Sequence, residues 1–402
     1  MIAFSDDANA ETLLAEFRSA SMKGFSFLSL NGFDAMFRTS GLFLVLFSLL
    51  ILCSASRSVA NSPPSPIFMV GDGGLLQPIL VQTAIRTYAI QQHASRISEN
   101  NSVIPQDRIG MQFNRLADVH MGNVLHGVGP GQFSVQRYKN LQEYRLTIER
   151  SFHANQCSWE IIAPIYRTSD NHIIGIDEIL RGPDRSVELG EFTVGLKSLL
   201  WYSHNTAWSA GLRIEAPTTR DIRIGTAANS PQTLIEKEAW YFTPWIGGQW
   251  NSSSDWYVTS FLSARLNSEH LDQYRSTAGG QYSLIDQPEY LFLDSAVGKN
   301  LVTTDTCLGT TNIASSFELH YATALDSTEP SNAVNNSASG TVFGRTDYLN
   351  LTAAISVGLG NRLLTSTGFA VPLRKSLHTQ TSFETDRTYD WAFFFQLNVL
   401  QR

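Results

Sequence analysis

Hydrophobic and polar residues alternate along most of the chain from about residue 110 to the C-terminus. The segment 390–399, DWAFFFQLNV, shows the pattern, because its odd positions from Trp391 to Val399 are all large and apolar. A period of two predicts a β-strand, since successive side chains of a strand point to opposite faces. One face of this strand therefore suits either a protein core or lipid.

The same alternation recurs upstream. It is clear in segments 144–149, 159–167, 191–202, 208–215, 317–323 and 349–359, and noisier in 110–120, 238–250, 256–266, 289–302 and 362–371. With the tail segment this makes about twelve predicted strands. Extended by a residue or two at each end, each can reach the roughly 9–11 residues that a tilted strand needs to cross a bilayer.

Short and long connections alternate between these strands. Short polar turns lie at 153–157, 203–205, 251–255, 303–307 and 360–361, and long segments at 121–143, 169–188, 217–237, 267–288, 326–345 and 373–388. Outer-membrane barrels show this asymmetry. The sequence predicts an all-β fold, a closed antiparallel transmembrane β-barrel of about 12 strands with short periplasmic turns and long external loops. A secreted soluble β-sandwich is the distant alternative.

Charged side chains occupy the polar face of several predicted strands. In a dry core each unpaired charge would cost several kcal/mol, whereas a barrel in lipid encloses water on that face. These residues are therefore predicted to line the lumen: Arg145, Glu149, Glu160, Glu191, Lys197, Arg213, Glu215, Arg265, Glu318 and His320. Because both signs are present, strong ion selectivity is not expected.

The composition agrees with strands that have one apolar and one polar face. The chain is 43% hydrophobic and only 16% charged, whereas charged residues make up about a quarter of soluble domains. Aromatic residues near strand ends suit the girdles of a barrel at the two membrane interfaces. The net charge of −7, without a basic run, argues against a nucleic-acid partner.

The N-terminal region has the features of a targeting signal. Residues 41–53 form an apolar run, shorter than the roughly 20 residues of a spanning helix. Arg38 before it and Ser58-Val59-Ala60 after it predict a signal peptide cleaved between Ala60 and Asn61. A short membrane anchor is the alternative, and Met22 or Met36 is an alternative start.

Three regions follow from these observations. Residues 1–60 are the signal peptide region, 61–109 a periplasmic or plug segment, and 110–402 the barrel. Within the second region, residues 81–94 carry a pattern that predicts a short amphipathic helix.

No enzyme motif is present. The chain contains no G-x-S-x-G, Walker loop, H-E-x-x-H or calcium loop, so we expect no catalytic residue, metal site or cofactor. The three cysteines, Cys53, Cys157 and Cys307, form no C-x-x-C pair. Whether Cys157 and Cys307 form a disulfide stays open.

Four segments resemble parts of uncharacterised porin-like outer-membrane proteins of planctomycete bacteria: 96–109, 188–201, 349–374 and 388–399. The chain is more loosely similar to outer-membrane transporters of the phenol-degradation type. The resemblance implies a bacterial cell outer membrane location, with the lipid bilayer, the barrel-insertion machinery and an unidentified small solute as partners. The chain ends Leu400-Gln401-Arg402, whereas such barrels usually end in an aromatic residue.

Two functions follow as expectations. The first is a porin-like channel for passive or weakly selective passage of small solutes. The alternative is a closed barrel that serves as a scaffold or a carrier of hydrophobic compounds, because side chains or the segment 61–109 can fill the narrow lumen of about twelve strands.

Overall fold

The structure, a computed structural model, describes most of the chain after residue 64. The described residues are 65–82, 87–125, 134–173, 185–219, 222–224, 233–236, 239–253, 255–268, 272–276, 282–285, 288–306, 309–325, 339–340, 347–360, 362–374 and 387–401. The predicted signal peptide region 1–60, with its cleavage point between Ala60 and Asn61, lies outside them, as does Cys307.

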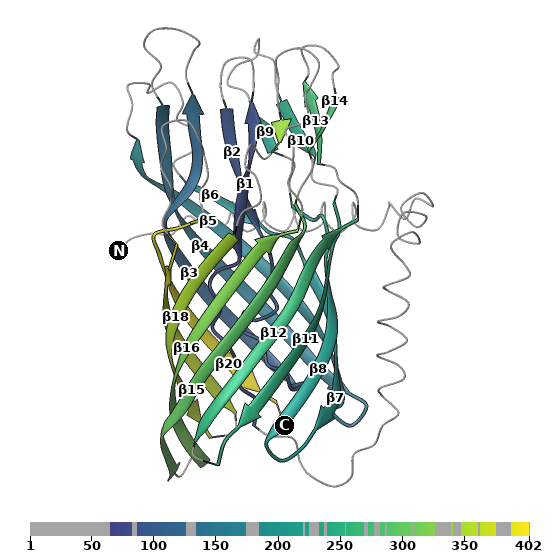
Figure 1. The fold of residues 1–402 in the computed structure, drawn as a ribbon, viewed down its shortest axis with the longest axis vertical. Helices are drawn as coiled ribbons and strands as arrows, with labels where there is room; N and C mark the ends of the chain where they lie inside the picture. The colour runs from purple at the N-terminus through teal and green to yellow at the C-terminus, as the bar shows by residue number, and fades with distance from the viewer. Residues whose placement is uncertain are drawn as a thin grey trace, which may run out of the picture.

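Twelve antiparallel strands form a closed barrel (Figure 1). Each strand pairs with the next one along the chain, and pairing of the first strand with the last closes the sheet. The prediction of an all-β barrel of about twelve strands is confirmed. The strands are β3 (Arg108–Leu125), β4 (Ser134–Phe152), β5 (Cys157–Ile173), β7 (Thr193–Tyr202), β8 (Thr206–Glu215), β11 (Tyr241–Asn251), β12 (Trp256–Asn267), β15 (Tyr290–Thr306), β16 (Gly309–Ala324), β18 (Asp347–Leu359), β19 (Leu363–Pro372) and β20 (Trp391–Leu400).

The two ends of the barrel differ, as the connection lengths predict. Short turns such as 153–156 and 203–205 join strands at the end where the C-terminus lies (Figure 1). Above the opposite end stands a four-stranded sheet built from segments between barrel strands: β9 (Ile222–Ile224), β10 (Thr233–Glu236), β13 (Asp272–Ser276) and β14 (Tyr282–Ile285). A further short strand, β6 (Arg185–Leu189), pairs with β5 ahead of β7, so the wall is interrupted at 190–192.

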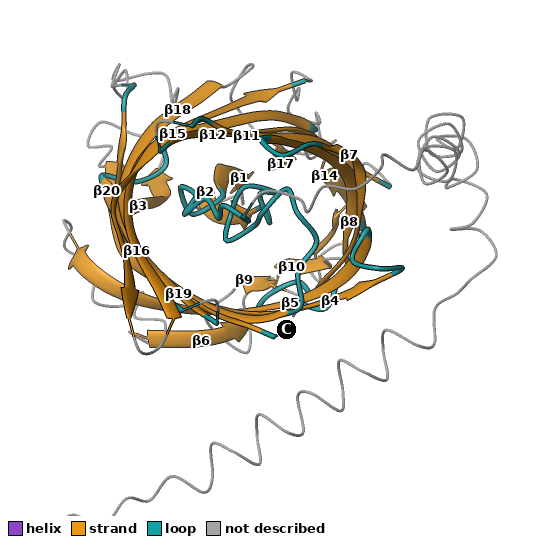
Figure 2. Cartoon of the chain, turned by 90° about the horizontal axis from the view of Figure 1, so that it is seen from below, coloured by secondary structure: helices purple, strands orange, loops and turns teal. Residues whose placement is uncertain are grey.

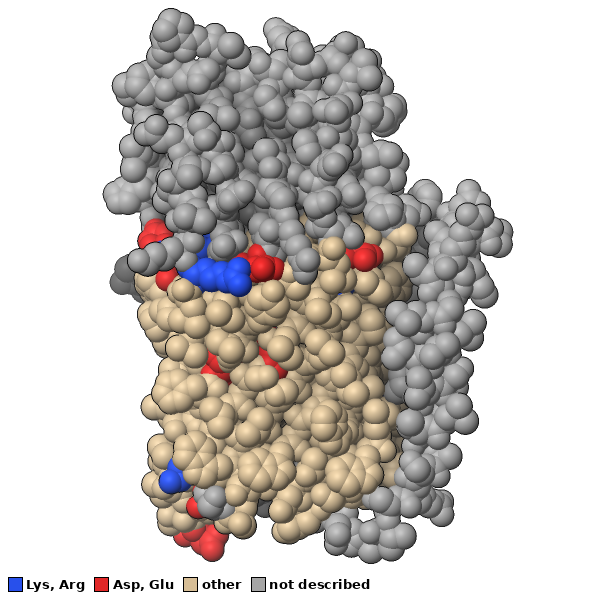
Figure 3. All heavy atoms as spheres, viewed as in Figure 1, with Lys and Arg blue, Asp and Glu red and all other residues tan. Residues whose placement is uncertain are grey.

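Apolar side chains cover the outward face, and the inward face carries the charged side chains together with some apolar ones. On β20, Phe393 and Val399 are 38% and 42% exposed, whereas Phe394 and Gln396 between them are fully buried. The same holds around the barrel, and Figure 3 shows the result as a broad band with few charges, most of which lie along its upper and lower borders. This outer surface can meet lipid, because closure of the sheet pairs the strand backbones with one another.

Placing a charge in the middle of this band is expected to be costly. Phe317 lies in the centre of β16 with 60% of its surface exposed. Phe317→Arg should reduce the free energy of unfolding in lipid vesicles by roughly 2–4 kcal/mol, because an arginine near the bilayer centre pays that penalty. The measurement is urea titration followed by tryptophan fluorescence.

Thr310→Arg, at the short-turn end of the same strand, is the matched control. There the expected cost is about 0–1 kcal/mol. Equal costs at both positions would show that the outer face does not lie in a hydrocarbon layer.

The N-terminal segment forms a hairpin rather than a helix. β1 (Leu75–Gln82) and β2 (Thr87–His93) pair antiparallel, with Val81 opposite Tyr88, and β1 also pairs with β17 (Ser339–Gly340). The predicted helix over 81–94 is therefore wrong. Val81, Tyr88 and Ile90 favour strands once partner strands satisfy the backbone, and a short apolar pattern alone does not separate the two structures.

On either side of this hairpin the chain passes through the barrel interior. Residues 65–76 rise from the short-turn end to the hairpin, and residues 93–107 return to the start of β3. Figure 2 shows this segment inside the ring of strands. We call residues 65–76 and 93–107 the plug. In the described part of the chain no helix is long and apolar enough to cross a membrane.

Candidate functional site: the plugged lumen

Residues 65–76 are the first pass of the plug through the barrel. Glu318 on β16 binds the backbone of this first pass. Its carboxylate accepts hydrogen bonds from the Val70 and Gly71 amides, at 2.9 Å each. Two neighbouring side chains complete the contact: Thr352 donates to the Gly71 carbonyl at 2.9 Å, and Gln396 donates to the Val70 carbonyl at 2.8 Å. The first pass is thereby fixed to three strands by charge-assisted and neutral hydrogen bonds.

Residues 93–107 are the second, returning pass of the plug. An ion cluster joins the two passes to each other and to the barrel wall. Arg96 of the second pass lies 3.1 Å from Asp72 of the first and 3.2 Å from Asp294 on β15. Asn350 donates to Asp72 at 2.7 Å, and His320 Nδ1 lies 2.9 Å from Asp294. All five side chains are buried, so each charge depends on its partners.

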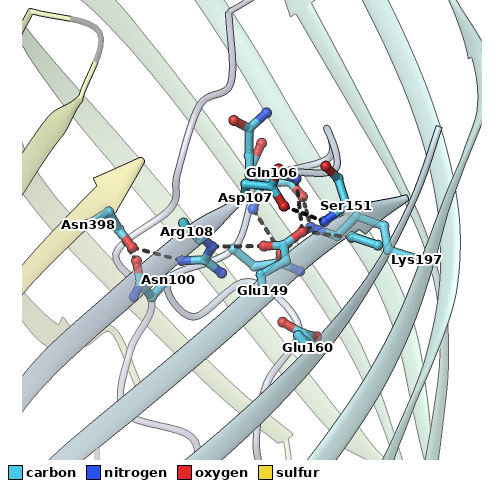
Figure 4. Close-up of polar contacts among 12 residues, drawn as sticks. Asn100, Gln106, Asp107, Arg108, Glu149, Ser151, Glu160, Lys197 and Asn398 are labelled. Atoms are coloured by element: carbon cyan, nitrogen blue, oxygen red, sulfur yellow. Dashed lines mark hydrogen bonds and ion pairs between the residues drawn. The ribbon is translucent and has the colours of Figure 1, made fainter. Parts of the chain in front are cut away.

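Glu149 on β4 is the centre of a second cluster, near the short-turn end (Figure 4). Its carboxylate accepts from Arg108 Nε at 2.8 Å, Lys197 Nζ at 2.9 Å and Ser158 Oγ at 2.8 Å. It also accepts from the Gln106 amide of the plug at 3.2 Å. One buried carboxylate therefore links four strands (β3, β4, β5 and β7) and the plug.

The two cations of this cluster reach further into the plug. Lys197 donates to Asn101 Oδ1 at 2.9 Å and to the Ser102 carbonyl at 2.8 Å. Arg108 donates to Asn398 Oδ1 at 2.8 Å, and Asn398 donates in turn to Asn100 Oδ1 at 2.7 Å. Figure 4 shows these side chains converging on the returning pass.

Three more arginines form ion pairs in the lumen. Arg145 contacts Glu99 of the plug and lies 2.7 Å from Glu143. The remaining pairs join neighbouring parts of the wall: Arg213 with Glu160 at 2.6 Å, and Arg265 with Glu215 at 3.0 Å and with Glu191 at 4.0 Å.

A glycine makes one of these pairs possible. Glu160 on β5 and Arg213 on β8 are separated by β7, whose Gly195 pairs with both. A Cβ at Gly195 would lie 2.5 Å from the Glu160 carboxylate. The missing side chain therefore lets the two charges meet across an intervening strand.

Gly195→Val is expected to lower the free energy of unfolding by about 1–3 kcal/mol, because a side chain forced into a packed site displaces its neighbours. Urea titration of the reconstituted protein measures this change. In a background carrying Glu160→Ala and Arg213→Met, which removes the pair and leaves room, the same valine should cost less. An unchanged cost in that background would contradict the packing argument.

Two carboxyl groups of the plug, which lie outside the barrel strands, have shifted pKa values. Burial raises the pKa of the Glu99 carboxyl to about 7, since Arg145 only partly offsets the burial and Glu143 adds repulsion. Burial also opposes ionisation of Asp72, but Arg96 and His320 outweigh it and lower the pKa of that carboxyl. Asp72 is thus held as an anion beside Arg96.

The structure brings the predicted lumen residues together in the barrel interior. Glu191 is half-buried. The other nine are buried: Arg145, Glu149, Glu160, Lys197, Arg213, Glu215, Arg265, Glu318 and His320. In this arrangement they pair with one another and with the plug. Their contact with a passing solute stays a prediction.

Sequence reasoning missed six charged members of these clusters: Asp72, Arg96, Glu99, Arg108, Glu143 and Asp294. Four of them precede the predicted barrel, in a region without a strand pattern. Glu143 directly precedes a predicted strand, and Asp294 lies on the polar face of a noisy one. Leu293 and Val297, which have the opposite parity and face outward, were the available signal that Asp294 faces inward.

Within the described residues, no group of three or more His, Cys, Asp or Glu side chains is placed to hold a metal ion. Cys157 is a free thiol, with its Sγ 3.7 Å from Ser198 Oγ.

No protein-family model and no curated protein sequence matches the chain, so the resemblance to planctomycete proteins is not supported by them. Among solved structures, an outer membrane channel from Pseudomonas putida F1 is similar at a TM-score of 0.43 and 10% identity, covering 74% of this chain and 96% of that one.

Two further solved structures are similar to a lesser degree. The β domain of the Bordetella autotransporter BrkA gives a TM-score of 0.39 at 9% identity, covering 74% of this chain and 100% of the other. A mutant of the TodX monoaromatic hydrocarbon channel gives 0.38 at 10% identity, covering 74% and 89%. At these scores the likenesses carry no argument about function, and the barrel assignment depends on the strand pairing of this chain.

Proposed function

We propose that this protein is a porin-like channel of the bacterial outer membrane whose lumen is occupied by its own N-terminal plug. The observation that carries the proposal is a closed barrel with an apolar outside and a charge-rich lumen, which residues 65–76 and 93–107 occupy. A surface of this kind suits a bilayer, and a polar interior has no structural use in a dry core.

Small solutes are the proposed cargo, and passage is passive and weakly selective. The lumen carries carboxylates and cations in similar numbers on its wall, so neither sign of ion is strongly favoured. The lipid bilayer and the barrel-insertion machinery are the further partners in this proposal. We expect no enzymatic activity, because the function needs only a path through the membrane.

The charged wall argues against the alternative of a carrier for hydrophobic compounds. Burying apolar cargo against Glu149, Lys197 or Glu318 would strip these groups of partners without replacing them. When the plug moves away, water can solvate the same groups, so the polar wall is compatible with both a plugged and an open lumen.

Planar bilayer recordings test the proposal with the full chain and with a variant lacking residues 65–104. The variant should give stable conductance steps with a cation-to-anion permeability ratio near one, and the full chain rare or smaller steps. Circular dichroism confirms that the variant keeps its strands. A sealed bilayer with a folded variant would instead support a closed scaffold.

A further inference from the structure

The hydrogen bonds between the plug and the barrel wall are unevenly distributed among the strands. On β11 and β12 the hydrogen bonds to the plug lie at the strand ends, where Gln249 bonds the Ser65 carbonyl and the Ile67 amide, and Arg265 lies 3.5 Å from the His93 carbonyl. Between these two points, the described side chains of both strands donate no hydrogen bond to the plug. The strong anchors, Glu149 and Glu318, lie on other strands.

Four polar side chains lie along the inner face of this wall: Trp245 pairs with Ser263 in its middle, Thr243 lies toward the Arg265 end, and Thr259 pairs with Gln249 itself. Thr243 and Trp245 on β11 and Thr259 and Ser263 on β12 are each at most 4% exposed. In the described part of the chain, their only hydrogen-bonding side-chain atoms have no partner: Thr243 Oγ1, Trp245 Nε1, Thr259 Oγ1 and Ser263 Oγ. Buried polar groups are normally paired, so we name these four residues the hydroxyl strip and ask what satisfies them.

The plug meets this wall with apolar side chains. Met69, Ile97 and Val103 belong to one buried cluster with Trp245 and Phe261, and the two rings contact edge to face at 5.7 Å between centroids. Such contacts are non-directional. Separation along this wall therefore breaks none of the hydrogen bonds that hold the plug to Glu318 or Glu149.

We propose that solute crosses the barrel along the hydroxyl strip, between the apolar face of the plug and strands β11 and β12, and that the strip takes small uncharged hydroxylated molecules. This deepens the proposed channel function and rests on it. Hydroxyl and indole groups pair with solute hydroxyls, and the Trp245 and Phe261 rings offer apolar faces to solute carbon atoms. The neighbouring Arg213 and Arg265 already pair with carboxylates, so no charge on the solute is required.

The test places a cysteine in the strip of the full chain, in a background carrying Cys157→Ser and Cys307→Ser. Ser263→Cys is compared with Ser366→Cys, which is equally buried on β19 but has a hydroxyl partner in Ser356 at 2.8 Å. Each variant is reconstituted in liposomes, and arabinose influx and reaction with hydroxyethyl methanethiosulfonate, an uncharged hydroxylated reagent, are measured. Thr259→Cys serves as a second strip position in case Ser263→Cys does not fold.

We expect the strip cysteine to react at least about ten times faster than Ser366→Cys, and arabinose influx to fall by more than half after reaction at the strip only. Equal reaction rates, or arabinose influx that is insensitive to reaction at the strip, would overturn the inference. So would a full chain that admits no arabinose while the variant lacking residues 65–104 conducts. The proposed channel itself fails separately, if that plug-deleted variant folds and stays silent.

Discussion

Replacing Glu149 with alanine is expected to lower the free energy of unfolding by roughly 3–5 kcal/mol, because it leaves two buried cations without their common partner. Arg108 and Lys197 both bind this carboxylate within 2.9 Å, and neither side chain is accessible enough for water to take its place. The Ser158 hydroxyl and the Gln106 amide lose an acceptor as well. Unfolding by urea in lipid vesicles, followed by tryptophan fluorescence, measures the change.

Two controls separate the loss of charge pairing from other effects. Glu188→Ala removes an exposed carboxylate on β6 and should change stability by no more than about 0.5 kcal/mol. Glu149→Ala combined with Lys197→Met removes one orphaned cation and should recover part of the loss, giving a coupling energy in the double-mutant cycle. Additive effects of the two replacements would contradict the pairing seen at this site.

Replacing Glu318 with alanine should release the first pass of the plug and raise the open probability of the channel. The carboxylate binds the backbone amides of Val70 and Gly71 directly, so its loss orphans two buried donors and breaks two charge-assisted bonds. At about 1.5–3 kcal/mol for each such bond, the plugged state should lose roughly 3–6 kcal/mol. Since 1.4 kcal/mol is a factor of ten, openings should become at least about 100-fold more frequent.

Single-channel recording in planar bilayers measures this increase. Glu318→Gln keeps one acceptor oxygen and should give an intermediate open probability. Thr310→Ala, at the exposed end of the same strand, should leave gating unchanged. An open probability that is the same for Glu318→Ala and the native chain would show that the first pass is not held here.

The free-energy cost of burying the ion pairs of the lumen bears on why these side chains are charged. Buried ion pairs often stabilise a fold no better than apolar side chains of the same size, because both charges lose their water. A permanently sealed barrel would be as stable with an apolar interior. In a channel whose plug moves, the same groups bind the plug in the closed state and water in the open state. Polar side chains are therefore favoured on the lumen wall in both states.

Much of the barrel was predictable from the chain itself. The two-residue period of segments such as 349–359 and 390–399 fixes which side chains face outward, because a strand has only two faces. The alternation of short and long connections indicates an even number of antiparallel strands, and closure follows from the need to pair every backbone group in lipid. These features are local or depend on a simple count, so no contact between distant residues is needed to infer them.

The occupant of the lumen was decided by tertiary structure. Residues 81–94 carry a pattern that predicts a helix, yet the segment pairs as a hairpin, because partner strands outweigh a weak local preference. The pairing of Glu318 with Val70 joins residues 248 positions apart, and the pair of Glu160 with Arg213 depends on the register of three strands around Gly195. Sequence alone shows that charges point inward, but which charge meets which partner depends on register and on the path of the plug, and only the folded chain sets both.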